Sequence, residues 1–146
     1  MATHIVAEIN TSTGLAEEYL LTVSDAVEAI DSVPAFENLA AGDFVNLFTD
    51  GGVCKARLAD ASNGRHADGF VKTVVTAPAT ATVYRRGVND QITGAPGAVH
   101  FLSATTPGKL TTTAPSGTGK YIQRIGTAKS ATAIDFERVN PVGPLL

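Results

Sequence analysis

The sequence has no tryptophan and one cysteine, and aromatic residues make up only 6% of its 146 residues. A hydrophobic core must therefore be built from Val, Ile, Leu and Ala with a few Phe, which is thin for this length. A thin core favours burial against a second copy or a partner. An internal disulfide is excluded, so the fold needs no oxidising compartment. We expect Cys54 to be a half-buried strand residue.

Lysine and arginine are absent from the first 54 residues. That part has a formal charge of −9 (nine acids, no bases), and residues 55–146 have +6 (11 bases, five acids). One interpretation is that both parts fold into one body and mix their charges on its surface. The other is that an acidic N-terminal segment docks on a basic body, its own or that of a neighbour.

Long hydrophobic runs are also absent. The longest stretch without a charged residue begins at Gln91 and ends before Lys109, and it contains prolines and glycines that exclude a membrane span. No basic region followed by an apolar run occurs at the N-terminus, so we expect no signal peptide. These features predict a protein made in a cytoplasm, without a membrane partner.

Short runs rich in β-branched residues alternate with Gly, Pro and Asn turns along the chain. They predict strands at Thr3–Ile9, Phe44–Thr49, Val53–Ala59, Asp68–Val75, Thr80–Arg85, Ala98–Ser103, Lys109–Thr113, Lys120–Thr127 and Thr132–Arg138. No long helix is needed. The expected fold is all-β, an antiparallel β-sandwich or jelly-roll-like fold with an irregular N-terminal segment. We divide it into residues 1–38 (a strand and an irregular arm), 39–138 (the body) and 139–146 (a C-terminal tail).

Three segments carry more specific predictions. Residues 15–31 fit a helix or a strand, and we favour a short strand at Tyr19–Val23 followed by irregular or weakly helical chain that Pro34 closes. Residues 87–97 are expected to be a loop. The last two predicted strands should form a hairpin around Lys129, and Ile134 and Phe136 should face the core while Asp135 and Glu137 face water.

No pattern of catalytic or ligand-binding residues stands out. Residues 116–120 end like a phosphate-binding loop, but Ala114 and Tyr121 occupy positions where that motif needs Gly and Ser or Thr, so we expect a turn. The three histidines are scattered without metal-ligand spacing, and His66 is expected to lie solvated in a polar loop. Basic residues are not interleaved with aromatic ones as nucleic-acid binding requires. We therefore predict no enzyme activity, cofactor, metal or nucleic-acid partner.

Residues 39–137 contain a series of spaced runs that resemble a β-module of tailed-phage structural proteins. The matching runs are Ala41–Asp43, Ala67–Val71, Thr82–Tyr84, Phe101–Ala104, Gln123–Thr127 and Asp135–Glu137. The family occurs as capsid decoration (cement) proteins and as domains of tail fibres. The chain is short and lacks a fibre stalk, so it looks most like a decoration protein.

This resemblance implies a jelly-roll-like structural protein on the capsid surface of a virion. Its implied partners are the major capsid protein and a second copy of itself, as a homodimer rather than a homotrimer. The alternative is a tail-fibre or spike domain that binds a host receptor.

Two apolar segments are candidate protein contacts. They are the patch Tyr19, Leu20 and Leu21 and the C-terminal residues Val142, Leu145 and Leu146. The alternative is that the first belongs to an ordinary core and the second is a frayed end.

Overall fold

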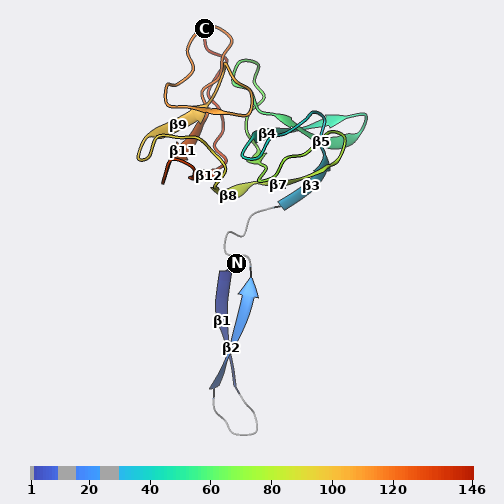
Figure 1. Cartoon of the computed structure of the whole chain (residues 1–146), viewed down its shortest axis with the longest axis vertical. Coiled ribbons are helices and arrows are strands. Elements are labelled where there is room, and N and C mark those ends of the chain that lie inside the picture. The colour runs from blue at the N-terminus through green and yellow to red at the C-terminus, as the bar shows by residue number, and fades with distance from the viewer. Residues whose placement is uncertain (1, 10–15, 24–29) are drawn as a thin grey trace.

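Strands joined by turns make up the described part of the chain. A computed structural model describes residues 2–9, 16–23 and 30–146, with side chains from residue 30 onward (Figure 1). The strands are β1 (Ala2–Ile9), β2 (Ala16–Val23), β3 (Ile30–Pro34), β4 (Phe44–Asp50), β5 (Val53–Leu58), β6 (Gly69–Phe70), β7 (Thr80–Tyr84), β8 (Arg86–Asn89), β9 (Val99–Leu102), β10 (Leu110–Thr111), β11 (Arg124–Thr127) and β12 (Ile134–Glu137). No helix long and apolar enough to cross a membrane occurs among these residues.

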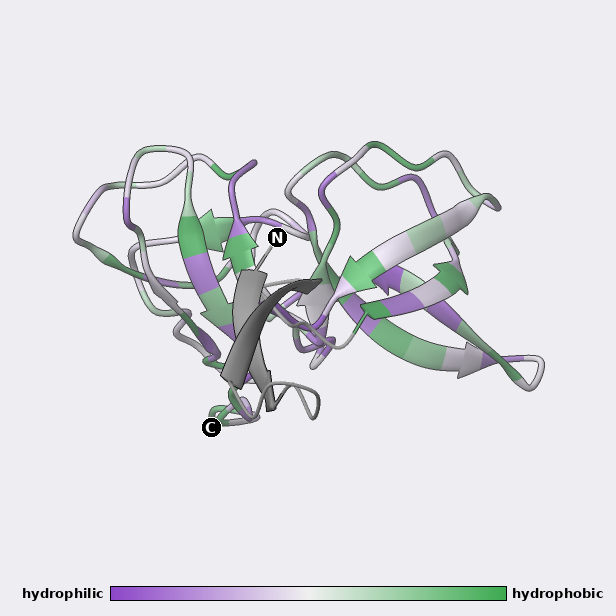
Figure 2. Ribbon diagram, turned by 90° about the horizontal axis from the view of Figure 1, so that it is seen from below, coloured by the Kyte–Doolittle hydropathy of each residue, from purple (hydrophilic) through white to green (hydrophobic). Residues whose placement is uncertain are grey.

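The strands form four sheets with antiparallel pairing. Their orders are β1-β2, β10-β9-β11, β12-β8 and β3-β7-β6-β4-β5. Figure 2 shows two groups of strands in the body, with hydrophobic and hydrophilic residues alternating along them. The prediction of an all-β, antiparallel fold is confirmed, and the jelly-roll-like arrangement stays a prediction.

The five-stranded sheet curls back on itself. A parallel bridge joins Ala35, just after β3, to Ala56 in β5, and Phe36 N–H donates to the Ala56 carbonyl (2.7 Å). The two outer strands of the sheet therefore meet. A tightly curled sheet has room for small side chains inside. The inner core accordingly consists of Ala35, Leu39, Val45, Ala56, Val71, Val75, Ala81 and Val83.

A second core lies on the other face of this sheet. Strand alternation turns Phe44 and Phe70 away from the inner core, towards β8, β9, β11 and β12. There, Phe44 packs against Phe136 (ring centroids 5.4 Å apart) and Phe70 against Tyr84 (5.6 Å). The remaining buried members are Ala59, Ala61, Ala67, Ile92, Leu102, Ile125, Ala128 and Ile134. Three of the six phenylalanines, Phe44, Phe70 and Phe136, thus pack between the sheets.

The β4–β5 hairpin agrees with its sequence prediction. Residues Gly51 and Gly52 connect the strands and have φ values of 58° and 78°. Primed hairpin turns need positive φ at both central positions, which glycine adopts without steric cost. The resulting register places Phe48 opposite Lys55 and Asn46 opposite Arg57. In β12, Ile134 and Phe136 are buried while Asp135 and Glu137 are exposed, as predicted.

Other local predictions are wrong or only partly right. The last two strands turn back on each other around Lys129 as predicted, since an antiparallel bridge joins Ala128 to Ile134 and Lys129 N–H donates to the Ala133 carbonyl (2.8 Å). Beyond that bridge their ladders are with other strands, because β12 pairs with β8 and β11 pairs with β9. Strand β8 lies in a segment expected to be a loop, since pairing with β12 overrides the weak strand propensity of Gly87 and Asn89. Strand β6 covers only Gly69–Phe70 of the predicted Asp68–Val75.

The N-terminal segment is more regular than expected where the structure describes it. Strand β2 extends the predicted Tyr19–Val23 back to Ala16, and β3 at Ile30–Pro34 was not predicted. The irregular or weakly helical chain expected between them falls on residues 24–29, outside the described residues.

Candidate interaction surface

The predicted contact residues of the N-terminal segment lie in β2. In the β1–β2 register, Tyr19 is opposite Val6, Leu20 opposite Ile5 and Leu21 opposite His4. Successive strand positions alternate between faces, so Tyr19 and Leu21 belong to one face of the hairpin and Leu20 to the other. The hairpin is a sheet of its own, and the structure does not join it to the C-terminal tail.

The C-terminal tail is held along its backbone and is not a frayed end. Ile122 and Val142 exchange two N–H to carbonyl hydrogen bonds (2.8 Å each), and Leu145 bonds to Gly119 and Lys120 (2.8 Å each). The side chain of Val142 is 66% exposed, Leu146 is fully exposed and Leu145 is half-buried. The tail therefore displays apolar side chains on an ordered backbone.

A second surface, missed in the sequence, lies on the outer face of the β4–β5 hairpin. We call Phe36, Phe48, Lys55 and Arg57 the cationic aromatic face. The two rings meet edge to face (5.1 Å between centroids), and Phe36 is 52% exposed. Arg57 Cζ lies 4.0 Å from the centre of the Phe48 ring, and Lys55 Nζ lies 5.9 Å from that of Phe36.

Strand alternation could have identified three of these residues but not the fourth. Phe48, Lys55 and Arg57 lie on one face of a hairpin whose turn is readable from the sequence. Phe36 reaches them because the sheet closes at Ala35 and Ala56, which no local pattern indicates.

A buried carboxylate anchors the inner end of this face. Asp68 Oδ2 accepts hydrogen bonds from Asn46 Nδ2 (3.1 Å) and from Leu47 N–H (2.9 Å). Its Oδ1 lies 3.0 Å from Arg138 Nε and 3.1 Å from His66 Nε2. The expectation of a solvated His66 in a polar loop is therefore wrong, because His66 pairs with the buried Asp68, which Arg138 also contacts from a distant part of the sequence.

Asn46 links this carboxylate to the cationic aromatic face, since its Oδ1 accepts a hydrogen bond from Arg57 Nε (2.9 Å). Partial burial and the neighbouring Arg65 lower the pKa of Arg57, and Glu37 opposes them. A lowered arginine pKa means that the surroundings disfavour positive charge. The face also carries an acid, because Lys55 Nζ forms an ion pair with Asp50 Oδ2 (2.7 Å).

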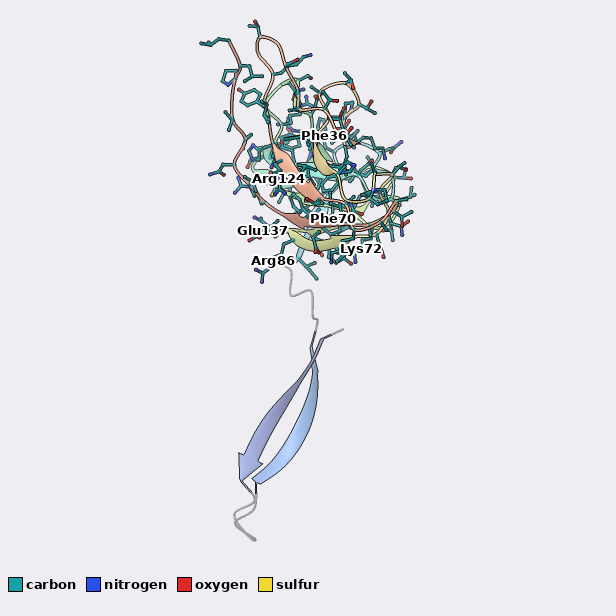
Figure 3. All side chains as sticks on the ribbon, turned by 90° about the vertical axis from the view of Figure 1, so that its left-hand side faces the viewer. Phe36, Phe70, Lys72, Arg86, Arg124 and Glu137 are labelled. Atoms are coloured by element: carbon teal, nitrogen blue, oxygen red, sulfur yellow. The ribbon has the colours of Figure 1, made fainter. Side chains whose placement is uncertain are left out.

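An open groove beside β11 and β12 has a volume of about 780 Å³. Its lining combines the charged residues Arg86, Arg124, Asp135 and Glu137 with the apolar residues Ile125, Phe136 and Val139. Figure 3 shows Arg86, Arg124 and Glu137 on the same side of the body. The lining is of mixed charge and suits a polar ligand or protein surface.

The remaining singled-out residues have structural surroundings. His100 is buried; its Nδ1–H donates to the Ala98 carbonyl (2.9 Å) and its Nε2 accepts from Ala95 N–H (3.2 Å). Arg85 pairs with Asp31, and this hydrogen bond raises the pKa of Arg85. Cys54 lies in β5, as predicted, but is exposed and not half-buried. In the described part of the chain, no group of His, Cys, Asp and Glu could hold a metal ion.

Comparison of the chain with protein-family models, with curated proteins and with solved structures found no match. The resemblance to phage decoration proteins therefore stays a prediction.

Proposed function

We propose that this chain is a non-enzymatic virion protein that binds the outside of a phage capsid and cements the lattice of the major capsid protein. The observation that carries the proposal is the display of Val142 and Leu146 on a tail that is hydrogen-bonded to the body. Exposed apolar side chains on an ordered backbone lose little conformational entropy when they bind a partner. That property suits an adhesive structural protein.

The polar residues of the resembling runs support a scaffold role. The Gln123 side chain bonds to both backbone polar groups of Ala67 (2.7 and 3.0 Å), and Asp43 Oδ1 forms an ion pair with Lys109 Nζ (2.5 Å). These side chains hold segments of the body together. Gln123 and Asp43 of the module that resembles phage proteins thus serve the architecture of the body.

Cementing follows from differential binding. A shell under internal pressure fails where its subunits separate, and a bound protein opposes separation if it binds the intact lattice better than the loosened one. Self-association would join several weak contacts, raising their effective concentration on the shell.

The test is the copy number of this protein in purified particles, measured by quantitative mass spectrometry against the major capsid protein. We expect a ratio near one to one, or a simple fraction set by the lattice symmetry. A handful of copies per particle, located at the tail, would contradict shell decoration.

That second outcome would favour the alternative, a tail-fibre or spike domain that binds a host receptor. The mixed-charge groove lined by Arg124 and Glu137 supports it, since polar grooves suit surface glycans and proteins. Under this alternative, Arg124→Ala would reduce adsorption of particles to host cells. Under shell decoration, adsorption would stay unchanged.

A further inference from the structure

The β1–β2 hairpin is a two-stranded sheet of its own among the described strands. Its two eight-residue strands pair with each other, and no other described strand joins their sheet. An isolated two-stranded hairpin is marginally stable in water. By register, both of its faces carry apolar residues: Val6 and Tyr19 share one, and Ile5 and Leu20 share the other. A partner surface would stabilise it.

One face of the hairpin also carries two acids opposite each other. The register places Glu8 directly opposite Glu17, and like charges in that arrangement destabilise a sheet. Neither strand contains Lys or Arg. The face that holds this acidic pair continues through Val6 and Tyr19 to Leu21. Its complement is a surface on which cations lie beside apolar or aromatic groups.

The cationic aromatic face has this composition. Lys55 and Arg57 lie beside the rings of Phe36 and Phe48. Lys55 Nζ also pairs with Asp50 Oδ2 (2.7 Å), a partly exposed contact that an acid of the hairpin would share or replace. Val53, 48% exposed at the start of β5, extends the apolar part. Acids would meet cations, and the aliphatic and tyrosine positions of the hairpin would meet the phenylalanine rings.

We infer that the β1–β2 hairpin of one copy docks on the cationic aromatic face of a second copy, giving a two-fold symmetric dimer with exchanged hairpins. Exchange uses each complementary pair of surfaces twice, so two modest contacts reinforce one another. The inference concerns the purified protein and goes beyond capsid binding, so either proposal can fail without the other.

The experiment uses two charge-reversed full-length variants, Lys55→Glu with Arg57→Glu and Glu8→Lys with Glu17→Lys. We expect the natural protein to be dimeric by sedimentation velocity, and each variant to dissociate at least about tenfold more readily, because like charges then face each other. Mixing the variants should restore a heterodimer, since acid and base are complementary again in both directions. Docking of a hairpin on its own body would give no such heterodimer.

Two further variants complete the test. Glu18→Lys lies by register on the other face of the hairpin and should leave the dimer unchanged. Phe36→Ser replaces a half-exposed ring and should weaken the dimer even if the double reversal on the body impairs folding. A monomeric natural protein, a mixture that stays monomeric, or an unchanged Phe36→Ser dimer would overturn the inference.

Discussion

At the residue scale, buried amides hold the body together. Gln123 is fully buried and accepts from Ala67 N–H, while its Nε2 donates to the carbonyls of Ala67 and Val139 (3.0 and 2.9 Å). Asn89, also fully buried, donates to the Gly42 carbonyl (2.9 Å). Because these side chains satisfy backbone groups that water cannot reach, their removal leaves buried polar atoms unpaired.

We therefore expect Gln123→Ala to lower the free energy of unfolding by about 3 kcal/mol, from lost hydrogen bonds and lost packing. Urea denaturation followed by circular dichroism measures this change. Gln91→Ala is the matched control, because that side chain is exposed, and its effect should stay within about 0.5 kcal/mol. Equal stability of the two variants would show that the Gln123 bonds contribute nothing net.

At the element scale, the C-terminal tail is paired with the body through its backbone. Its backbone pairs with residues 119–122, but Val142 and Leu146 contribute little buried apolar area. Neither hydrophobic core includes a tail residue. The tail can therefore be removed while both cores stay intact.

Deletion of residues 141–146 should leave the strand content of the body unchanged and reduce occupancy on capsids. Far-ultraviolet circular dichroism measures the first and co-sedimentation with stripped capsids measures the second. The double variant Val142→Ser and Leu146→Ser keeps the backbone pairing and should reduce occupancy similarly. If the truncated protein still occupied capsids fully, the tail would not be part of the contact surface.

At the scale of the whole molecule, the five-stranded sheet couples two cores. Neighbouring residues of one strand enter different cores: Phe44 lies in the core between the sheets and Val45 in the inner core. Phe70 and Val71 divide in the same way. Loss of packing in one core would disturb the backbone of β4 and β6, which also positions side chains of the other core.

We expect the body to unfold in one cooperative transition. Leu39→Ala in the inner core and Ile134→Ala in the core between the sheets should each lower the free energy of unfolding by about 2–5 kcal/mol. Both should shift that same transition. Differential scanning calorimetry checks this through equality of the calorimetric and van 't Hoff enthalpies. A separate second peak in either variant would show that the cores unfold independently.

The sequence by itself determined what local patterns encode. Glycine dipeptides, β-branched runs and period-two alternation specified the all-β fold class, the β4–β5 turn and the buried face of β12. These features depend on the conformational preferences and the burial of residues that are close in sequence. The segregation of acids into the first 54 residues was also readable directly.

Tertiary structure alone decided which strands pair and which distant residues meet. The pairing of β12 with β8, the closure that brings Phe36 to Phe48, and the approach of Arg138 to Asp68 all join segments far apart in the chain. Such contacts form because the apolar faces of several strands must be buried at the same time. The sequence of one segment does not indicate which other segment will bury its apolar face.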